Sequence, residues 1–111
     1  MKTILFGLIG GVLLAGNAMA ANAPVEMPPQ AKKHQCDSCH AIDERVVGPA
    51  WRDVAAKYRG DVSAAERLQI KVSKGGKGTW GSMPMPANDP QGTKQEDIRA
   101  LIQFILALPA S

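Results

Sequence analysis

The chain has 111 residues with 13 basic and 10 acidic side chains and two cysteines, which gives a formal charge of +3 at neutral pH. That charge is too small to indicate a nucleic-acid-binding protein, although it allows attraction to an acidic partner. The length is enough for one small domain.

Residues 1–20 have the features of a secretory signal peptide. Lys2 supplies a positive start, Ile4 to Ala15 form an apolar run, and Ala18-Met19-Ala20 offers small residues for cleavage. The run is short for a membrane span. We therefore expect residues 1–20 to be removed, residues 21–111 to form the domain, and the mature protein to reach the periplasm without stable membrane insertion. A retained N-terminal anchor is the alternative.

Two short helices are predicted in the first half of the domain. Pro28-Pro29 is expected to open a helix that runs into Cys36, because proline is tolerated in the first helical turn. Gly48-Pro49 marks a turn, and a second helix is expected from Ala50 to Tyr58, ended by Gly60.

Two more helices are predicted in the second half. Ser63-Ala-Ala-Glu66 and Thr93-Lys-Gln-Glu96 resemble capping boxes, and Gly75-Gly76 is expected to stop the first of these helices. The apolar positions of the last helix fall on one face; they are Ile98, Leu101, Ile102, Ile105 and Leu108. The segment between these two helices, Gly75 to Gly92, is rich in Gly, Pro and Ser and is expected to be a binding loop. No strand pattern occurs, so the fold class is all-α.

Cys36-Asp-Ser-Cys39-His40 matches the attachment signature of c-type haem. The spacing lets both sulfurs reach the vinyl groups on one side of the macrocycle, and the histidine is then carried under the ring to bind iron. A redox dithiol would need a βαβ pattern that the sequence lacks. A zinc site would need a fuller ligand set. A disulfide between Cys36 and Cys39 is the remaining alternative.

The sixth iron ligand decides what such a protein does. A methionine closes the site and suits electron transfer, whereas an open face favours binding or activating a small molecule. Met83 and Met85 are the candidates, and both lie in the loop before the last helix. For a methionine on a surface loop, gap-filling or simple exposure is the alternative role.

The mature chain resembles the short bacterial class I cytochromes c. The resemblance runs from Gln35 to the C-terminal helix and rests on Cys36-Asp-Ser-Cys39-His40-Ala-Ile-Asp, Val47-Gly-Pro-Ala50, Asp53-Val-Ala-Ala-Lys57, Gly78-Thr-Trp-Gly81 and Pro84-Met-Pro86 with Asn88. More narrowly, it is similar to periplasmic monohaem donors to haem-containing nitrite reductases and terminal oxidases. It implies about four short helices around one covalently attached haem c.

The resemblance also implies roles for individual residues. His40 and Met85 would be the axial iron ligands, with Met83 as packing. The Pro49 carbonyl would accept the Nδ1–H of His40, and Asn88 would donate to the ligating sulfur. Two cofactor contacts complete the set: Trp80 matches a donor to a haem propionate, and Lys71 stands where an arginine commonly reaches that group.

Three further positions depart from the family pattern. In the family, an aromatic residue of the first helix usually packs across the last helix, and Ala31 stands at that position. Phe104 on the last helix still matches the family's aromatic. Gln35 replaces a glycine beside the first cysteine. His34 is badly placed to bind iron, and we expect it to be a solvated polar side chain.

These features predict a monomeric one-electron carrier rather than an enzyme. Its partners would be an upstream donor and a reductase or oxidase, reached through a small patch at the haem edge. A haem enzyme or gas sensor with a labile sixth ligand is the alternative, and an accessory module of a larger complex is another. Six basic residues are candidates for the patch, with a solvated face as the alternative: Lys32, Lys33, Arg45, Arg52, Lys74 and Lys77.

Overall fold

The computed structural model describes residues 3–5, 7–13 and 24–109, and the expected cleavage segment at residues 18–20 lies outside them. The described residues contain four α-helices, one 3-10 helix and no strand, which confirms the all-α class. The elements are α1 (Pro29–Lys33), η2 (Cys36–Ser38), α2 (Trp51–Lys57), α3 (Ala64–Lys74) and α4 (Gln95–Leu106). Among the described residues, no helix is long and apolar enough to cross a membrane.

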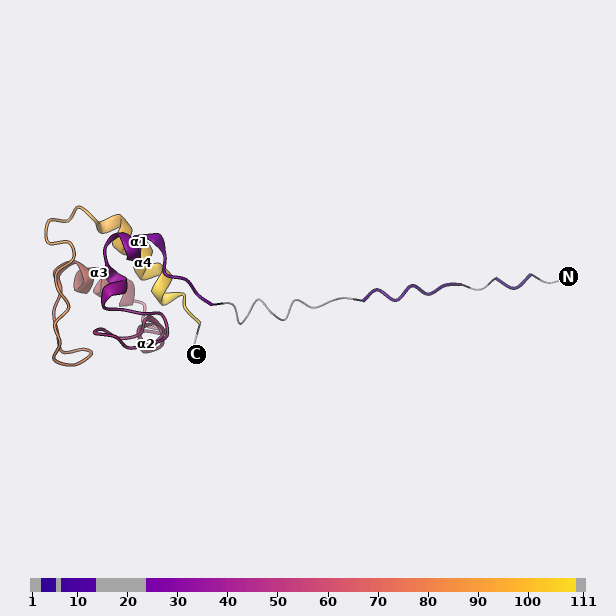
Figure 1. Ribbon diagram of the computed structural model, residues 1–111, viewed down its shortest axis with the longest axis horizontal. Helices are drawn as coiled ribbons and strands as arrows, with labels where there is room; N and C mark the ends of the chain where they lie inside the picture. Colours follow the sequence, from indigo (N-terminus) through magenta and orange to yellow (C-terminus); the bar gives the residue numbers. More distant parts are fainter. Residues whose placement is uncertain (1–2, 6, 14–23, 110–111) are drawn as a thin grey trace.

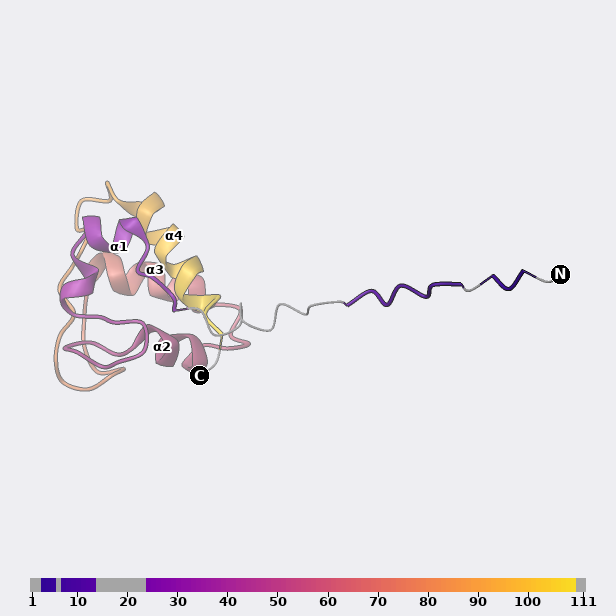
Figure 2. The same cartoon turned by 45° about the vertical axis from the view of Figure 1, so that its right-hand side comes forward.

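Helix α4 is the centre of the domain. It packs against α1, α2 and α3, and Figures 1 and 2 show α1 and α3 lying beside it while α2 lies at the other end of the domain. The predicted apolar face is confirmed, because Ile98, Leu101, Ile102 and Ile105 of α4 are buried. Leu108 is buried too, although it lies two residues after the end of the helix. Burial of this face supplies much of the stabilisation of a domain with few aromatic residues.

The first helix is shorter than expected. α1 ends at Lys33, with His34 as its C-terminal cap, and does not run into Cys36. The cause is Gln35, which has φ 59° and ψ 27° and therefore leaves the right-handed helical region. The chain then makes the separate 3-10 turn of η2. The glycine that the family usually carries at this position would adopt the same conformation without strain.

The contact between α1 and α4 is repacked around a small residue. Ala31 is fully buried where the resemblance implied an aromatic, so α1 meets α4 with a small side chain at this position. Phe104 instead packs edge-on against Trp51 of α2, with ring centroids 6.1 Å apart. The aromatic contact thus joins α4 to α2 in this chain.

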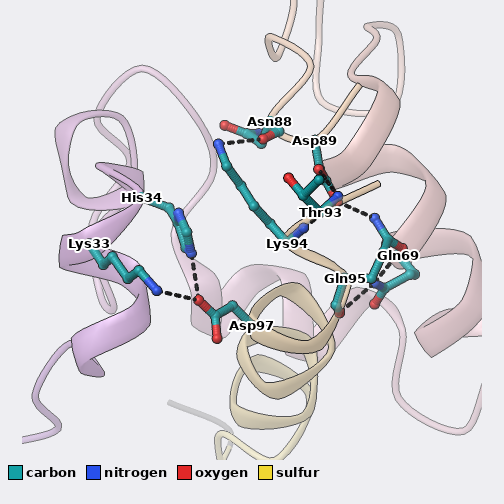
Figure 3. A network of polar contacts seen from close by, with 9 residues as sticks. All are labelled: Lys33, His34, Gln69, Asn88, Asp89, Thr93, Lys94, Gln95 and Asp97. Carbon is teal, nitrogen blue, oxygen red and sulfur yellow. Dashed lines mark hydrogen bonds and ion pairs between the residues drawn. The ribbon is translucent and has the colours of Figure 1, made fainter. Parts of the chain in front are cut away.

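His34 is not solvated, so that prediction was wrong. Its Nε2 lies 2.7 Å from Oδ2 of Asp97 in the first turn of α4, and its side chain is only 12% exposed. Lys33 donates to the same carboxylate oxygen at 3.2 Å (Figure 3). The packing of α1 on α4 brings these residues together, and hydropathy alone gives no sign of such a pair.

Both predicted capping boxes were wrong in detail, although both helices form. Neither Ser63 nor Thr93 caps its helix through its side chain. The acceptors are carboxylates further upstream: Asp61 Oδ1 accepts the Ser63 N–H at 2.9 Å, and Asp89 Oδ1 accepts the Thr93 N–H at 2.8 Å. An aspartate before a helix satisfies free N–H groups in the same way as a serine cap.

The segment between α3 and α4 is a loop, as expected. It leaves α3 at Gly75, whose φ of 74° ends the helix, and runs along one edge of the domain to the level of α2 before returning to α4 (Figures 1 and 2). Its two arms are joined by a bridge between Gly76 and Met85. The bridge holds the Met85 backbone beside the end of α3.

Candidate functional site

A cavity with about 1300 Å³ of empty space, including the part open to solvent, is lined by the η2 region, α2, α3, the α3–α4 loop and α4. Its walls are mainly apolar. They include Val54, Leu68, Ile98, Leu101, Ile102 and Ile105. The charged residues that line it are all cations, namely Arg45, Lys71 and Lys77. Such a cavity suits a large apolar ligand that carries acidic groups at its edge.

Cys36, Cys39 and His40 all line this cavity. The tight turn of η2 brings them together, since Cys36 O accepts the N–H groups of Cys39 at 3.1 Å and of His40 at 2.9 Å. The two cysteines form no disulfide. Burial raises the pKa of the Cys36 thiol, which favours the protonated form.

The His40 ring is held in one orientation. Its Nδ1 lies 2.8 Å from the Pro49 carbonyl oxygen, and because a carbonyl only accepts, Nδ1 must carry the proton. In the neutral imidazole, Nε2 then keeps its lone pair for a metal. Gly48 lies against the ring: a Cβ at this position would be 2.9 Å from Nδ1 and from Nε2. The ring of Trp51 lies 5.9 Å away between centroids.

Met85 and Met83 also line the cavity, but their surroundings differ. Met85 and Gly76 exchange two backbone hydrogen bonds, at 2.8 Å and 3.0 Å. Gly75 packs so closely on this strand-like segment that a Cβ there would be 2.5 Å from the Met85 carbonyl oxygen. These contacts fix the backbone of Met85. The side chain of Met83, by contrast, is 63% exposed.

Trp80 and Lys71 also line the cavity. The carbonyl of Trp80 accepts a hydrogen bond from Arg45 at 3.1 Å, which joins the α3–α4 loop to the segment after His40. The indole lies under a cation, because Lys57 Nζ is 5.5 Å from its ring centroid. The ammonium group of Lys71 lies beside Gly76.

Asn88 lines the cavity, and its amide bonds to the backbone. Its Nδ2 donates to the carbonyls of Val72 at 3.2 Å and of Pro86 at 3.1 Å. The amide therefore ties the loop to α3, and a bond from Asn88 to the ligating sulfur stays a prediction.

The donor set fits a covalently bound haem. Two thiols, an imidazole with a free Nε2 and a methionine line one apolar cavity, and the cations that line it would be partners for the acidic substituents of a haem. Cys36 and Cys39 would hold the group, with His40 and Met85 as candidates for its iron. No group of three or more His, Cys, Asp or Glu among the described residues offers a different metal site.

Comparison with known proteins agrees with this donor set. A family model described as cytochrome c matches residues 17–109. The chain belongs to the cytochrome c family. Members of this family carry electrons on a covalently attached c-type haem, so this cytochrome c is a haem-based electron carrier and not an enzyme.

Several bacterial relatives are similar over most of their length. Cytochrome c-551 of Allochromatium vinosum is 50% identical over 78 residues, which cover 70% of this chain and 81% of the relative. Cytochrome c-552 of Nitrosomonas europaea is 40% identical over 110 residues, which cover 97% and 99%. The crystal structure of Nitrosomonas europaea cytochrome c552 aligns with a TM-score of 0.66 and 42% identity, covering 72% of this chain and 96% of that one.

One buried residue near the site was missed by the sequence reasoning. Asp89 is only 4% exposed and comes shortly after Met85 in the sequence. The sequence signal was Asn88-Asp89-Pro90, since Asx residues before proline mark turns in which the side chain accepts backbone N–H groups.

Proposed function

We propose that this cytochrome c is a periplasmic one-electron carrier in which His40 and Met85 bind the haem iron. The observation that carries the proposal is that the backbone-fixed Met85 lines the same apolar cavity as Cys36, Cys39 and His40. Haem iron supplies a one-electron couple, and a His/Met ligand pair raises its potential. His40 keeps Nε2 available through its bond to Pro49.

The ligand assignment is tested by replacing each methionine in the haem-loaded protein. Met85→Ala should abolish the sulfur–iron charge-transfer band of the oxidised protein, lower the reduction potential and let the reduced protein bind carbon monoxide. Met83→Ala should leave all three properties close to wild type, because Met83 is exposed. The reverse result would assign the iron to Met83.

The same measurements separate the carrier from the alternative class. A wild-type reduced protein that resists carbon monoxide at neutral pH has a closed iron and behaves as a carrier. Ready binding would instead indicate a haem enzyme or gas sensor with a labile sixth ligand.

The periplasmic location rests on residues 1–20 as a removed signal peptide. The prediction is that the protein in a periplasmic extract begins at Ala21, as measured by intact mass and N-terminal sequencing. A protein that retains residues 1–20 and sediments with membranes would support an N-terminal anchor.

The partners are proposed to be an upstream donor and a terminal reductase or oxidase with an acidic docking surface. Arg45 and Lys77 are exposed and line the cavity, so they are better candidates for docking than Lys33 and Arg52, which pair with Asp97 and Asp43. Raising the ionic strength should slow electron transfer to the partner. A rate independent of salt would exclude this steering, and gel filtration would test the expected monomer.

A further inference from the structure

Asp89 is a buried carboxylate at the end of the α3–α4 loop, close in sequence to Met85. Its Oδ1 accepts the Thr93 N–H at 2.8 Å, and its Oδ2 accepts the Lys94 N–H at 2.9 Å. The Gln95 side chain donates to Oδ2 at 2.6 Å (Figure 3). The carboxylate therefore connects the loop to the first residues of α4.

The same part of the loop is connected to the end of α3. Ser73 O accepts the Asp89 N–H at 3.1 Å, and Val72 O accepts the Asn88 N–H at 3.1 Å. Gln95 closes the arrangement, because its Nε2 also donates to the Ser73 hydroxyl at 2.9 Å. Asp89, Gln95 and Ser73 thus join the loop, α4 and α3 at one buried point.

The chemistry of Asp89 makes this junction sensitive to substitution. Burial raises the pKa of Asp89, but the hydrogen bonds from Gln95, Lys94 and Thr93 outweigh it and leave the pKa below its ordinary value. The side chain is then a carboxylate at neutral pH, and the described residues offer it no cationic ion-pair partner. A buried charge of this kind is tolerated only while its hydrogen bonds are intact.

We propose that Asp89 is a positioning residue for Met85: by docking the end of the loop on α3 and α4, it holds the methionine on the iron. The inference rests on the proposed role of Met85. The chain between them, Pro86-Ala87-Asn88, is short and is itself bonded to α3 through Asn88. The backbone bonds of Asn88 and Asp89 to α3 do not depend on the Asp89 side chain. Loss of the carboxylate therefore removes the attachment to α4 and loosens the loop on the side of Met85 that the Gly76 bridge does not restrain.

The test uses the haem-loaded protein with Asp89→Asn and Asp89→Ala. Asparagine keeps one acceptor and loses the second, whereas alanine removes all three side-chain bonds. We expect a weaker sulfur–iron band, a lower potential and carbon monoxide binding to the reduced protein that is about tenfold faster, because one lost hydrogen bond to a charged group changes an equilibrium by about that factor. The effect should be larger for alanine.

Asp61→Asn is the matched control. Asp61 also precedes a helix and accepts a backbone N–H, from Ser63 at 2.9 Å, and it bonds the Ser63 hydroxyl and Arg67. None of these bonds reaches the α3–α4 loop. The control should lower stability as Asp89→Asn does, while the band, the potential and carbon monoxide binding remain those of the wild type.

Gln95→Ala is the second variant, because it cuts the link from Asp89 to Ser73 while Thr93 and Lys94 still donate to the carboxylate. It should give a smaller change in the same direction, and it decides the question if Asp89→Ala does not fold. Wild-type carbon monoxide binding in Asp89→Asn and Gln95→Ala, with an abolished band in Met85→Ala, would overturn the positioning role and leave the ligand assignment standing. A wild-type band in Met85→Ala would overturn both.

Discussion

Gly48 shows how a single missing side chain orients His40, the proposed iron ligand. Its backbone packs on the His40 imidazole so closely that an added Cβ would clash with Cε1, Nδ1 and Nε2. We predict that Gly48→Ala pushes the ring away from Pro49 and costs about 1–3 kcal/mol of stability by overpacking. Because loss of the Pro49 hydrogen bond makes the imidazole a less basic ligand, the reduction potential should rise. Thermal unfolding and redox titration of the haem-loaded protein measure the two effects.

Gly60→Ala is the control for Gly48. Gly60 has a φ of 79° and open space around its Cβ position, so alanine there introduces backbone strain without a clash. It should cost about 1–2 kcal/mol and leave the potential unchanged. Equal potentials in the two variants would mean that Gly48 does not orient His40.

Gln35 carries strain that another residue would relieve. It is the only non-glycine residue with positive φ among the described residues, and its side chain is exposed. Gln35→Gly should stabilise the protein by about 1 kcal/mol and raise Tm by roughly 4–8 °C. Lys32→Gly, at an exposed helical position of α1, should destabilise it by a similar amount. A lower Tm in Gln35→Gly would contradict the strain argument.

At the scale of elements, patterns that depend on one segment were predictable and patterns that depend on two were not. The buried face of α4 follows from helical periodicity, and Cys36, Cys39 and His40 meet because their spacing fits one turn. His34 and Asp89 were misjudged or missed because each is buried only when α4 packs beside it. Gln35 ended α1 early by adopting a positive φ, which the helical propensity of glutamine does not indicate.

The His34–Asp97 pair makes the attachment of α1 to α4 sensitive to acid. The hydrogen bonds from His34 and Lys33 hold the pKa of Asp97 below its ordinary value. A lowered folded-state pKa adds stability that is present above the unfolded value of about 3.9 and is lost as the pH falls through the folded value. We predict that Asp97→Asn lowers the urea midpoint near neutral pH and that the difference from wild type disappears in acid.

Glu96→Gln controls for the general effect of a negative charge near the start of α4. Glu96 lies in the same first turn as Asp97 but is exposed and has no hydrogen bond or ion pair within the part of the chain that the structure describes. Both variants remove one charge from the helix N-terminus. A pH-dependent loss of the same size in both would assign the effect to the helix dipole and not to the α1–α4 contact.

At the scale of the whole molecule, the core and the cavity wall are made of the same side chains. Trp51, Val54, Leu101 and Ile105 belong to the buried cluster and also line the cavity. A domain of this size buries a modest core, so a large apolar ligand between α2, α3 and α4 supplies contacts that the helices cannot make with one another. Ligand binding to the folded state alone stabilises that state.

Removal of the covalent attachment therefore tests the architecture. We predict that the double variant C36S/C39S, which cannot attach haem, has weak helical far-UV circular dichroism and no cooperative thermal transition. Met85→Ala keeps both thioether positions and should retain helix and cooperativity, which separates the loss of the whole group from the loss of one ligand. A helical, cooperatively folding C36S/C39S protein would mean that the side chains around the cavity close on one another, and that the haem occupies a fold it does not stabilise.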